Sequence, residues 1–410
     1  MEHPFFIKVE NNIIEKIDVG GPTMVRAAAK NFPGVIVIVD PSDYAWIGER
    51  LSSARGSNPL STISIEERRT LARKAFQHIA YYDTAVSQFL GKSDLLIDPE
   101  VTLGYVQHAK LRYGENPHQQ AAAYQIPDNA TNNILNATIH QGKMLSYNNI
   151  MDADAALACL KEFDETACVI VKHSNPCGAA TGNDLLDVYS RAFNADSLSA
   201  FGGIIALNRK CTEEVAIEIT KVFVEIVLAP AYDPKALTLF SKKKNLRILE
   251  VENPQKHEKR LEVRNINGGV LLQETDISTL SSADLTIVTK NKPNETDIET
   301  MLFGWKIIKH VRSNGIIAVR ENTTVGIGAG QVSRVDAVDI AIRKAGDNLP
   351  GSILCSDAFF PFRDSIDKIA GKGIIAIIQP GGSVRDQEVI NACNEHGISM
   401  VFTGQRCFKH

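Results

Sequence analysis

The stretch ACVIVKHSNPCGAATGNDLLDVYSRAF, residues 167–193, contains both kinds of regular element that recur along the chain. Ala167–Val171 is an apolar run of the length expected for a buried strand. His173–Gly178 is polar and rich in turn residues, and it is predicted to be a loop. Asn183–Phe193 carries apolar residues at helical spacing. The order strand, loop, helix indicates an α/β fold.

The same order returns near the C-terminus. Gly373–Ile378 predicts a strand, Arg385–His396 a helix, and Ile398–Phe402 another strand. Strands that alternate with helices indicate sheets with helical crossovers. Asp276–Asp297 is polar and without periodicity, so a subdomain boundary is predicted there.

The first segment of the chain is also predicted to be α/β. Val35–Val39 reads VIVIV, a continuous β-branched run typical of a strand covered on both faces, and a helix is predicted before it at Pro22–Asn31. Ser64–Gln88 predicts a longer helix, because Ser64 and Glu67 have the spacing of a capping box.

Composition narrows the function classes. The 410 residues allow two or three domains, and a net charge of −4 offers no general attraction to nucleic acid or anionic lipid. Any bound phosphate must therefore be met by a few placed cations.

No apolar run approaches the ~20 residues of a membrane span, and the N-terminus lacks a secretory signal, so a cytoplasmic protein is expected. The seven cysteines are scattered without a C-x-x-C pair, which gives no support to a disulfide framework or a cysteine-rich zinc site.

Several polar segments are candidates for chemistry. Lys172 and His173 follow the strand Ala167–Val171, at the edge where open α/β sheets place ligands, and together they can move a proton and stabilise charge. The glycine-rich run Gly326–Gly330 fails the dinucleotide fingerprint, because Gln331 replaces its third glycine, but it can present N–H groups to an anion before a helix at Val335–Lys344. The other candidate segments are Lys110–Gln119, Leu198–Gly203, Arg312–Asn314 and Ser356–Asp364.

These residues leave alternatives open. Each segment can be a solvated loop or core packing, and a single histidine is more often structural than catalytic. Cys177 after Pro176 matches half of a zinc-deaminase motif, although H-x-E and P-C-x-x-C are both missing. Cys177 paired with His173 is an alternative nucleophile, although nothing in the sequence marks its thiol as activated. From the residues alone, we expect an enzyme acting on a phosphorylated or heteroaromatic small molecule.

Taken together, the segments resemble the bifunctional purine biosynthesis family that joins AICAR formyltransferase to IMP cyclohydrolase. The resemblance covers residues 91–410 without a gap. Its motifs are KLRYGENPHQ, LSYNNIMDADAA, VKHSNPCG, SAFGG, the run through Lys306–Asn314, GIGAGQVSRVDA, SDAFFPFRD, IIQPGGSVRDQEV and FTGQRCFKH.

The resemblance implies a formyltransferase of two cytidine-deaminase-like subdomains, at 91–280 and 281–410, that forms a homodimer with shared active sites. The implied reaction moves a formyl group from 10-formyltetrahydrofolate to the 5-amino group of AICAR in IMP biosynthesis. A monovalent cation such as potassium is implied, and no zinc. The family's positions place catalysis on Lys172, His173 and Asn314, with His173 as the proton-shuttling base. They place substrate binding on Arg112, Tyr113, Asn149, Gly202, Glu225, Arg334, Phe359, Asp364 and Arg406.

Residues 1–85 resemble only the later part of the cyclohydrolase domain, a methylglyoxal-synthase-like α/β fold. They supply Asp18, Gly20 and Lys30 of its motifs, while the phosphate-gripping loop and the K-T-x-x-P segment are expected before Met1. The resemblance therefore implies a shortened cyclohydrolase domain whose ring-closing activity is in doubt. The alternative from another class is a catalytically silent, nucleotide-binding relative, against which the intact Lys172, His173 and Asn314 argue.

Overall fold

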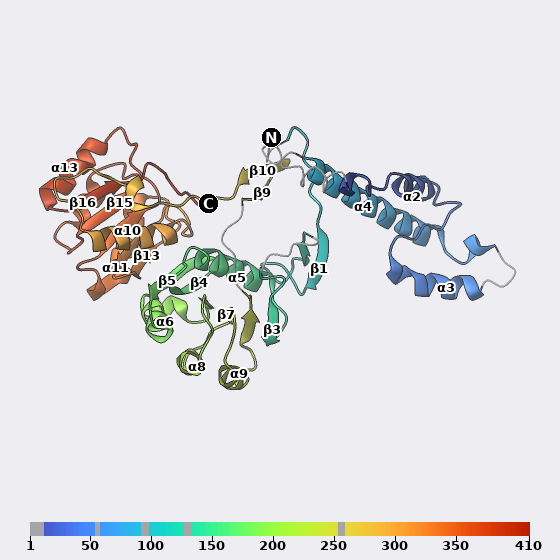
Figure 1. The fold of residues 1–410 in the computed structure, drawn as a ribbon, viewed down its shortest axis with the longest axis horizontal. Coiled ribbons are helices and arrows are strands. Elements are labelled where there is room, and N and C mark those ends of the chain that lie inside the picture. The colour runs from blue at the N-terminus through green and yellow to red at the C-terminus, as the bar shows by residue number, and fades with distance from the viewer. Residues whose placement is uncertain (1–11, 54–57, 92–97, 127–132, 253–258) are drawn as a thin grey trace. The chain divides into compact units, whose positions relative to one another are not determined.

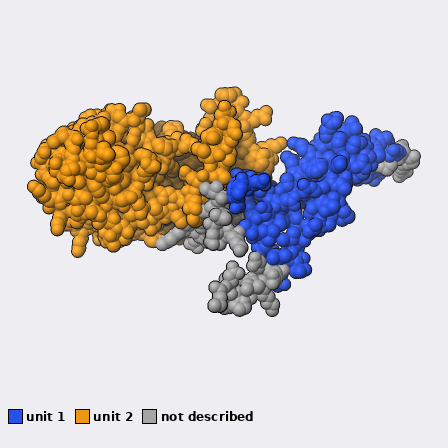
Figure 2. Space-filling model, turned by 90° about the horizontal axis from the view of Figure 1, so that it is seen from above, with its two compact units in different colours: residues 1–106 blue, residues 107–410 orange. Residues whose placement is uncertain are grey.

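The computed structural model describes residues 12–53, 58–91, 98–126, 133–252 and 259–410. The chain divides into two compact units, Met1–Val106 and Gln107–His410, which Figure 2 shows in different colours. Both contain helices, and the second is built on a large mixed sheet, so the α/β class predicted from the sequence is confirmed. No helix among these described residues is both long enough and apolar enough to cross a bilayer.

The first unit is built from helices. Its helices are α2 (Gly20–Lys30), α3 (Tyr44–Ser53) and α4 (Ile65–Leu90), with short 3-10 turns at Pro41–Asp43 and Pro59–Ser61. The predicted capping box is present, since the Ser64 hydroxyl accepts from Glu67 N and the Glu67 carboxylate accepts from Ser64 N. Arg68 on α4 is buried, and its guanidinium donates to the carbonyl oxygens of Phe32, Leu60 and Ile63. This side chain therefore ties two loops to α4.

The prediction of a strand at Val35–Val39 is wrong. The segment has no hydrogen-bonded neighbour strand among the described residues of the unit. Its side chains nevertheless alternate between two small apolar clusters, with Val37 against Ala29 and Ala75 and Ile36 against the cluster of Ile47 and Leu71. The apolar pattern thus predicted the two-sided burial, but a strand also needs a partner backbone.

The second unit contains a 12-stranded sheet in the order β11-β16-β15-β14-β12-β13-β5-β4-β6-β7-β8-β3. Its strands are β3 (Thr138–Gln141), β4 (Thr166–Lys172), β5 (Asn175–Gly182), β6 (Ile204–Leu207), β7 (Ile226–Ala229), β8 (Arg247–Glu250), β11 (Thr286–Ile287), β12 (Ile316–Arg320), β13 (Thr323–Gly328), β14 (Ile353–Ser356), β15 (Ala376–Gln379) and β16 (Ser399–Phe402). Two separate hairpins pair β1 (Val106–Leu111) with β2 (Ala121–Gln125), and β9 (Leu261–Ile266) with β10 (Gly269–Glu274).

The large sheet consists of two halves with the same strand arrangement. In the first half, β4 and β5 form an antiparallel hairpin, β6 runs antiparallel to β4, and β6, β7 and β8 are parallel. In the second half, β12 and β13 form the hairpin, β14 runs antiparallel to β12, and β14, β15 and β16 are parallel. An antiparallel edge strand closes each half, β3 beside β8 and β11 beside β16. The halves meet where Thr323 of β13 pairs with Ala180 of β5.

The helices follow the same duplication (Figure 1). The first half has α5 (Tyr147–Leu160), α6 (Leu185–Asn194), α7 (Ser197–Ala200), α8 (Glu213–Thr220) and α9 (Pro234–Phe240), and the second has α10 (Glu295–Ile308), α11 (Arg334–Ala345), α12 (Asp364–Ile369) and α13 (Asp386–His396). Residues of α5 and α10 share one apolar core with strands from both halves. The remaining helices pack on the other face in two separate cores, one for each half.

Glycines in the two hairpins allow helices to approach the sheet closely. A Cβ at Gly178 of β5 would lie 1.9 Å from the carbonyl oxygen of Ala192 on α6, and one at Gly328 of β13 would lie 2.0 Å from that of Ala337 on α11. Gly326 and Gly328 lie within β13, where they pair with Ala318 and Ile316 of β12. The run Gly326–Gly330, expected to present N–H groups to an anion, is therefore mostly strand. The N-terminus of α11 is capped within the chain, because Ser333 Oγ accepts from Asp336 N.

The prediction of a loop at His173–Gly178 is wrong beyond Ser174. The chain turns back at His173 and Ser174 alone, and Asn175–Gly182 forms β5. The prediction failed because Asn, Pro and Gly are typical loop residues. Pro176 is nevertheless accommodated in β5, because it pairs with Val171 next to a β-bulge, where its missing N–H is tolerated. The site segment is therefore a hairpin tip, with helix α6 only after the second strand.

Candidate functional site

The tip of the β4–β5 hairpin exposes the imidazole of His173. His173 and Ser174 both have left-handed backbones, with φ of 49° and 58°, as a two-residue hairpin of the primed type requires. Lys172 precedes them at the end of β4, and its Nζ donates to the Phe201 carbonyl oxygen at 2.8 Å. The hairpin therefore places a cation and an exposed imidazole on consecutive residues.

The turn after α7 packs directly against this lysine. Gly202 has a φ of +69°, and a Cβ at this position would lie 3.0 Å from Lys172 Nζ and 3.2 Å from the Phe223 ring. The rings of Phe201 and Phe223 are 5.4 Å apart. Gly202 is thus needed both for its backbone conformation and for the space that Lys172 occupies.

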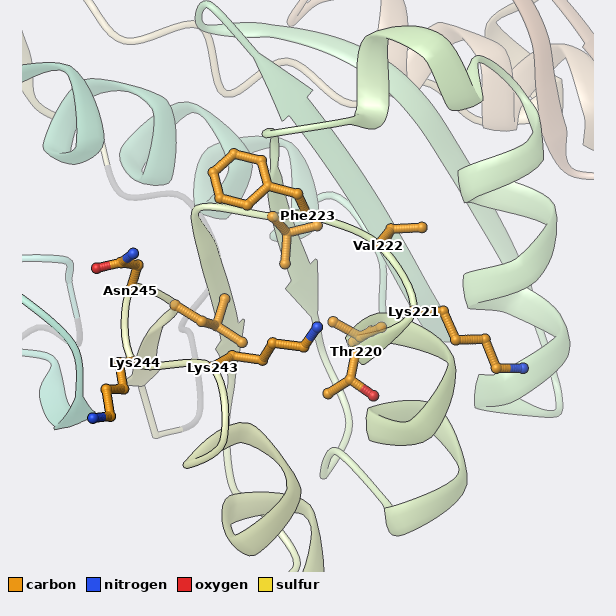
Figure 3. A pocket seen from close by; sticks show the side chains of 10 residues that line it. Thr220, Lys221, Val222, Phe223, Lys243, Lys244 and Asn245 are labelled. Carbon is orange, nitrogen blue, oxygen red and sulfur yellow. The ribbon is translucent and has the colours of Figure 1, made fainter.

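A cavity of about 250 Å³ opens beside Phe223. It lies between the loops of residues 219–224 and 243–246 (Figure 3). The Lys243 side chain extends between the two loops towards Thr220, whereas Lys221 and Lys244 point outwards. Lys221 is paired with Glu218 at 2.5 Å, but no carboxylate in the described part of the chain pairs with Lys243 or Lys244. The cavity is therefore positively charged.

Glu225 and Arg247 directly follow the residues that line this cavity. Arg247 Nη1 donates to Glu225 Oε2 at 2.8 Å, and Glu225 is the more exposed partner. Arg247 Nε is buried, with no hydrogen-bond partner among the described residues. The carboxylate is thus held in place while part of it faces solvent, where it can accept hydrogen bonds from a ligand.

The second half contributes a buried polar network. Arg334, the first residue of α11, donates through Nη2 to Asn314 Oδ1 at 2.8 Å and through Nη1 to Asp357. The Asn314 amide nitrogen donates to the carbonyl oxygens of Gln331 and Val332, at 2.8 and 3.1 Å. Both ends of the Asn314 side chain therefore have partners within the chain.

Asn175 joins the two halves at the hairpin. Its Oδ1 accepts from Arg312 N at 3.0 Å, and its Nδ2 donates to the His173 carbonyl oxygen at 3.2 Å. One amide side chain thus connects the turn that carries His173 with the segment that leads to Asn314. The structure brings these predicted catalytic residues to one junction.

Three predicted substrate-binding residues, Arg112, Tyr113 and Asn149, lie in the first part of the second unit. The Arg112 guanidinium lies 5.6 Å from the Tyr113 ring centroid. Their loop reaches α5 through Glu115, whose carbonyl oxygen accepts from Asn148. Asn149 is buried, and its Oδ1 accepts from Ser146 N in the α5 capping box. In this structure Asn149 caps a helix.

Three further predicted residues lie elsewhere in the second half. Phe359 is exposed, whereas its neighbour Phe360 is fully buried. Asp364 is exposed at the start of α12, where its carboxylate accepts from Ser365 N. Arg406 lies over the Phe408 ring. The described residues show no bond from any of these three to Asn314 or His173.

In the first unit, Asp18, Gly20 and Lys30 do not form a cluster. Asp18 Oδ1 accepts from Gly21 N at 2.9 Å at the beginning of α2, and Lys30 is exposed at its end. An 11-residue helix separates them by roughly 15 Å along its axis.

The thiol alternative is not supported by the geometry. Cys177 is buried in β5, and burial raises the pKa of its thiol to about 12, so it stays protonated near neutral pH. Among the described residues, no group of three or more His, Cys, Asp or Glu side chains has the arrangement of a metal site.

Sequence reasoning missed several residues of the site. Asp152, Asn175 and Asp357 stand inside the quoted motifs, but their long-range partners are not visible in the sequence. Lys243 and Lys244 belong to the run Lys242–Lys244, a local positive charge that could have indicated an anion site.

Comparison with known proteins identifies the family. Residues 28–344 match the AICARFT/IMPCHase bienzyme family. The chain is 48% identical to the bifunctional purine biosynthesis protein purH of Dictyostelium discoideum, over 97% of this chain and 78% of that protein. It is 46% identical to the bifunctional purine biosynthesis protein PurH of Aquifex aeolicus, over 100% of this chain and 80% of that protein. The resemblance seen in the motifs is confirmed, and the chain belongs to the AICARFT/IMPCHase bienzyme family.

Proposed function

We propose that this chain is an AICAR formyltransferase, which transfers the formyl group of 10-formyltetrahydrofolate to the 5-amino group of AICAR. The observation that carries the proposal is the junction at Asn175, where the Lys172–His173 hairpin of one half meets the Arg312–Asn314 segment of the other. Family membership supports the same reaction.

His173 is the proton acceptor in this proposal. The 5-amino group of AICAR is a weak nucleophile because its lone pair is conjugated with the ring, so attack on the formyl carbonyl needs a base. The His173 side chain is exposed at the hairpin tip and can approach the amine of a bound substrate.

Lys172 is the group best suited to stabilise the oxyanion of the tetrahedral intermediate. Its ammonium has three hydrogens, and the described residues accept one of them, at the Phe201 carbonyl oxygen. Both amide hydrogens of Asn314 already donate to backbone carbonyl oxygens. We therefore assign Asn314 to holding the junction together with Arg334.

The nucleotide part of AICAR fits the cavity beside Phe223. Lys243 supplies a cation for the phosphate, and Lys244 adds positive charge to the cavity wall. Glu225, oriented by Arg247, supplies a carboxylate for the ribose hydroxyls. Arg112, Tyr113 and Arg406 remain the predicted nucleotide contacts. Asn149, Gly202, Arg334 and Phe359 remain predicted to line the site, and Asp364 is predicted on the folate side.

The duplicated sheet supports two cytidine-deaminase-like subdomains, and the predicted domains at 1–85, 91–280 and 281–410 remain part of the proposal. So does the homodimer with shared active sites. A cytoplasmic location and a potassium ion also remain predictions, and elemental analysis of purified protein tests the latter.

We assign the family's second activity, closure of the formylated product to IMP, to the first unit. Within that unit Asp18 precedes α2 and Lys30 is the last residue of α2, and Asp18 Oδ1 already accepts a hydrogen bond from Gly21 N. We therefore expect slow ring closure by this chain.

Purified protein incubated with AICAR and 10-formyltetrahydrofolate tests the main proposal, with formyl-AICAR and IMP quantified separately by mass spectrometry. Folate-dependent formation of formyl-AICAR supports it. Binding of AICAR without turnover would instead favour a catalytically silent, nucleotide-binding relative. Ring closure is measured in the same way from added formyl-AICAR without folate.

A further inference from the structure

The His173 hairpin turn contains two non-glycine residues in the left-handed region. The free energy of this conformation is unfavourable for residues with a Cβ, so it persists only where other contacts stabilise it. The position of the His173 imidazole depends on this turn, because the backbone of residue 173 sets the direction of its side chain.

Asp152 on α5 holds the second residue of the turn. Its Oδ1 accepts from Ser174 N at 2.8 Å and from Ser174 Oγ at 3.1 Å. An ionised acceptor makes such hydrogen bonds stronger than neutral ones. Asp152 is partly buried and lies on a helix that belongs to the core shared by both halves. The turn is therefore anchored to a rigid element.

The other hairpin of the duplicated sheet provides an internal comparison. Its turn residues Glu321 and Asn322 are also left-handed, with φ of 51° and 55°. By the repeat of helix and strand order, the α10 position that corresponds to Asp152 is Thr300, which is not a carboxylate. Arg191 of α6 donates to the Glu321 carbonyl oxygen at 3.4 Å instead. The carboxylate anchor thus belongs to the hairpin that carries His173.

From these contacts we infer that Asp152 is a positioning residue, which sets the orientation of the His173 imidazole by holding Ser174 in the left-handed turn. The inference rests on the proposed function for its kinetic effect. It requires no contact between Asp152 and a substrate, because Asp152 acts through the backbone of the turn.

Steady-state kinetics of Asp152→Ala test this role. Misplacement of a reacting group by about 1 Å can cost on the order of a hundredfold in rate. We expect kcat for formyl transfer to fall by about ten- to a hundredfold, while KM for AICAR stays close to that of the wild type. Asp152→Asn keeps an acceptor oxygen and should retain most of kcat.

A glycine rescue separates positioning from general stability. Glycine adopts the left-handed conformation without a Cβ penalty, so the double variant Asp152→Ala with Ser174→Gly should recover much of the lost kcat. The matched control is Asp152→Ala with Asn322→Gly, which relieves the other left-handed turn and should recover none. Equal recovery by both glycines, or wild-type kcat in Asp152→Ala, would overturn the inference.

Hydrogen exchange at the Ser174 amide gives a readout that does not depend on activity. Loss of its acceptor should make this amide exchange at least about tenfold faster in folded Asp152→Ala than in the wild type, because the hydrogen bond protects it. Unchanged exchange would overturn the inference even if the chain showed no formyl transfer. An inactive wild type with faster exchange in the variant would contradict the proposed function alone.

Discussion

Asp357 and Arg334 form an ion pair that is sealed from solvent, with side chains 0% and 6% exposed. Asp357 Oδ2 also accepts from Ser313 Oγ at 2.5 Å and from Gly315 N at 3.0 Å. Arg334 in turn donates to Asn314. This pair therefore connects α11 and the end of β14 to the segment that meets the His173 hairpin.

Replacing Asp357 by alanine should strongly destabilise the second unit. The change leaves the Arg334 guanidinium buried without its counter-ion, and breaking a buried pair from one side costs about 3–5 kcal/mol. Urea unfolding followed by circular dichroism measures the loss. Asp339→Ala, which breaks a solvent-exposed pair with Lys368, is the control and should change stability far less. Equal effects of the two variants would contradict this account.

Replacing His173 by alanine should abolish most formyl transfer and preserve AICAR binding. Proton transfer by a positioned side chain contributes roughly 10²–10⁴-fold to rate, so kcat should fall within that range. Turnover and calorimetric AICAR binding are compared with those of His396→Ala, a surface histidine paired with Asp367. Turnover within a few-fold of the wild type would refute the base assignment.

Replacing both Lys243 and Lys244 by glutamine should weaken AICAR binding. A hydrogen bond to a charged group contributes about 1.5–3 kcal/mol, so KM for AICAR should rise at least about tenfold. Added salt should raise KM more in the wild type than in this variant, because the lost attraction is electrostatic. The control Lys242→Gln lies in the same lysine run but outside the cavity. An unchanged KM in the double variant would place the phosphate elsewhere.

The native protein should react slowly with thiol reagents. All seven cysteines are buried, and burial raises the pKa of the Cys177 and Cys211 thiols to about 12. Ellman's reagent at pH 8 should therefore titrate few thiols before unfolding and seven in denaturant. Cys177→Ser should retain substantial formyl transfer. A rapidly labelled Cys177, or a covalent acyl adduct on it, would revive a nucleophilic role for its thiol.

Acid should destabilise the fold through His310. Burial lowers the pKa of this imidazole from 6.5 to about 4, although its Nε2 lies 3.0 Å from Glu162 Oε1. Between these two values the unfolded chain binds a proton at His310 that the folded chain does not. The contribution of His310 to the free energy of unfolding is therefore fully present above about pH 6.5 and is lost as the pH falls towards 4. The depressed pKa corresponds to about 3 kcal/mol across the window.

Urea unfolding of the wild type and His310→Gln at several pH values between 4 and 7.5 measures this contribution. The variant should show a shallower pH dependence in that window, because glutamine does not titrate. If the free energy of unfolding changed with pH in the same way in both proteins, His310 would be excluded as the source of the pH dependence.

The sequence by itself determined those features that depend on neighbours along the chain. The Ser64–Glu67 capping box, the strand around Val169 and the helix Asp386–His396 follow from local hydrogen bonding and apolar periodicity. Nine ordered motifs also sufficed to indicate the family.

Only the tertiary structure decided which polar groups meet. Arg312 and Asn175 are 137 residues apart, and Asp357 and Gly315 are 42 apart, so no local pattern pairs them. For the same reason Val35–Val39 reads as a strand but lacks a paired backbone in the described residues. The secondary-structure propensity of a segment depends on residues close to it in the sequence. The hydrogen-bond partners of its polar groups depend instead on which distant segments the fold brings together, here through the pairing of β5 with β13.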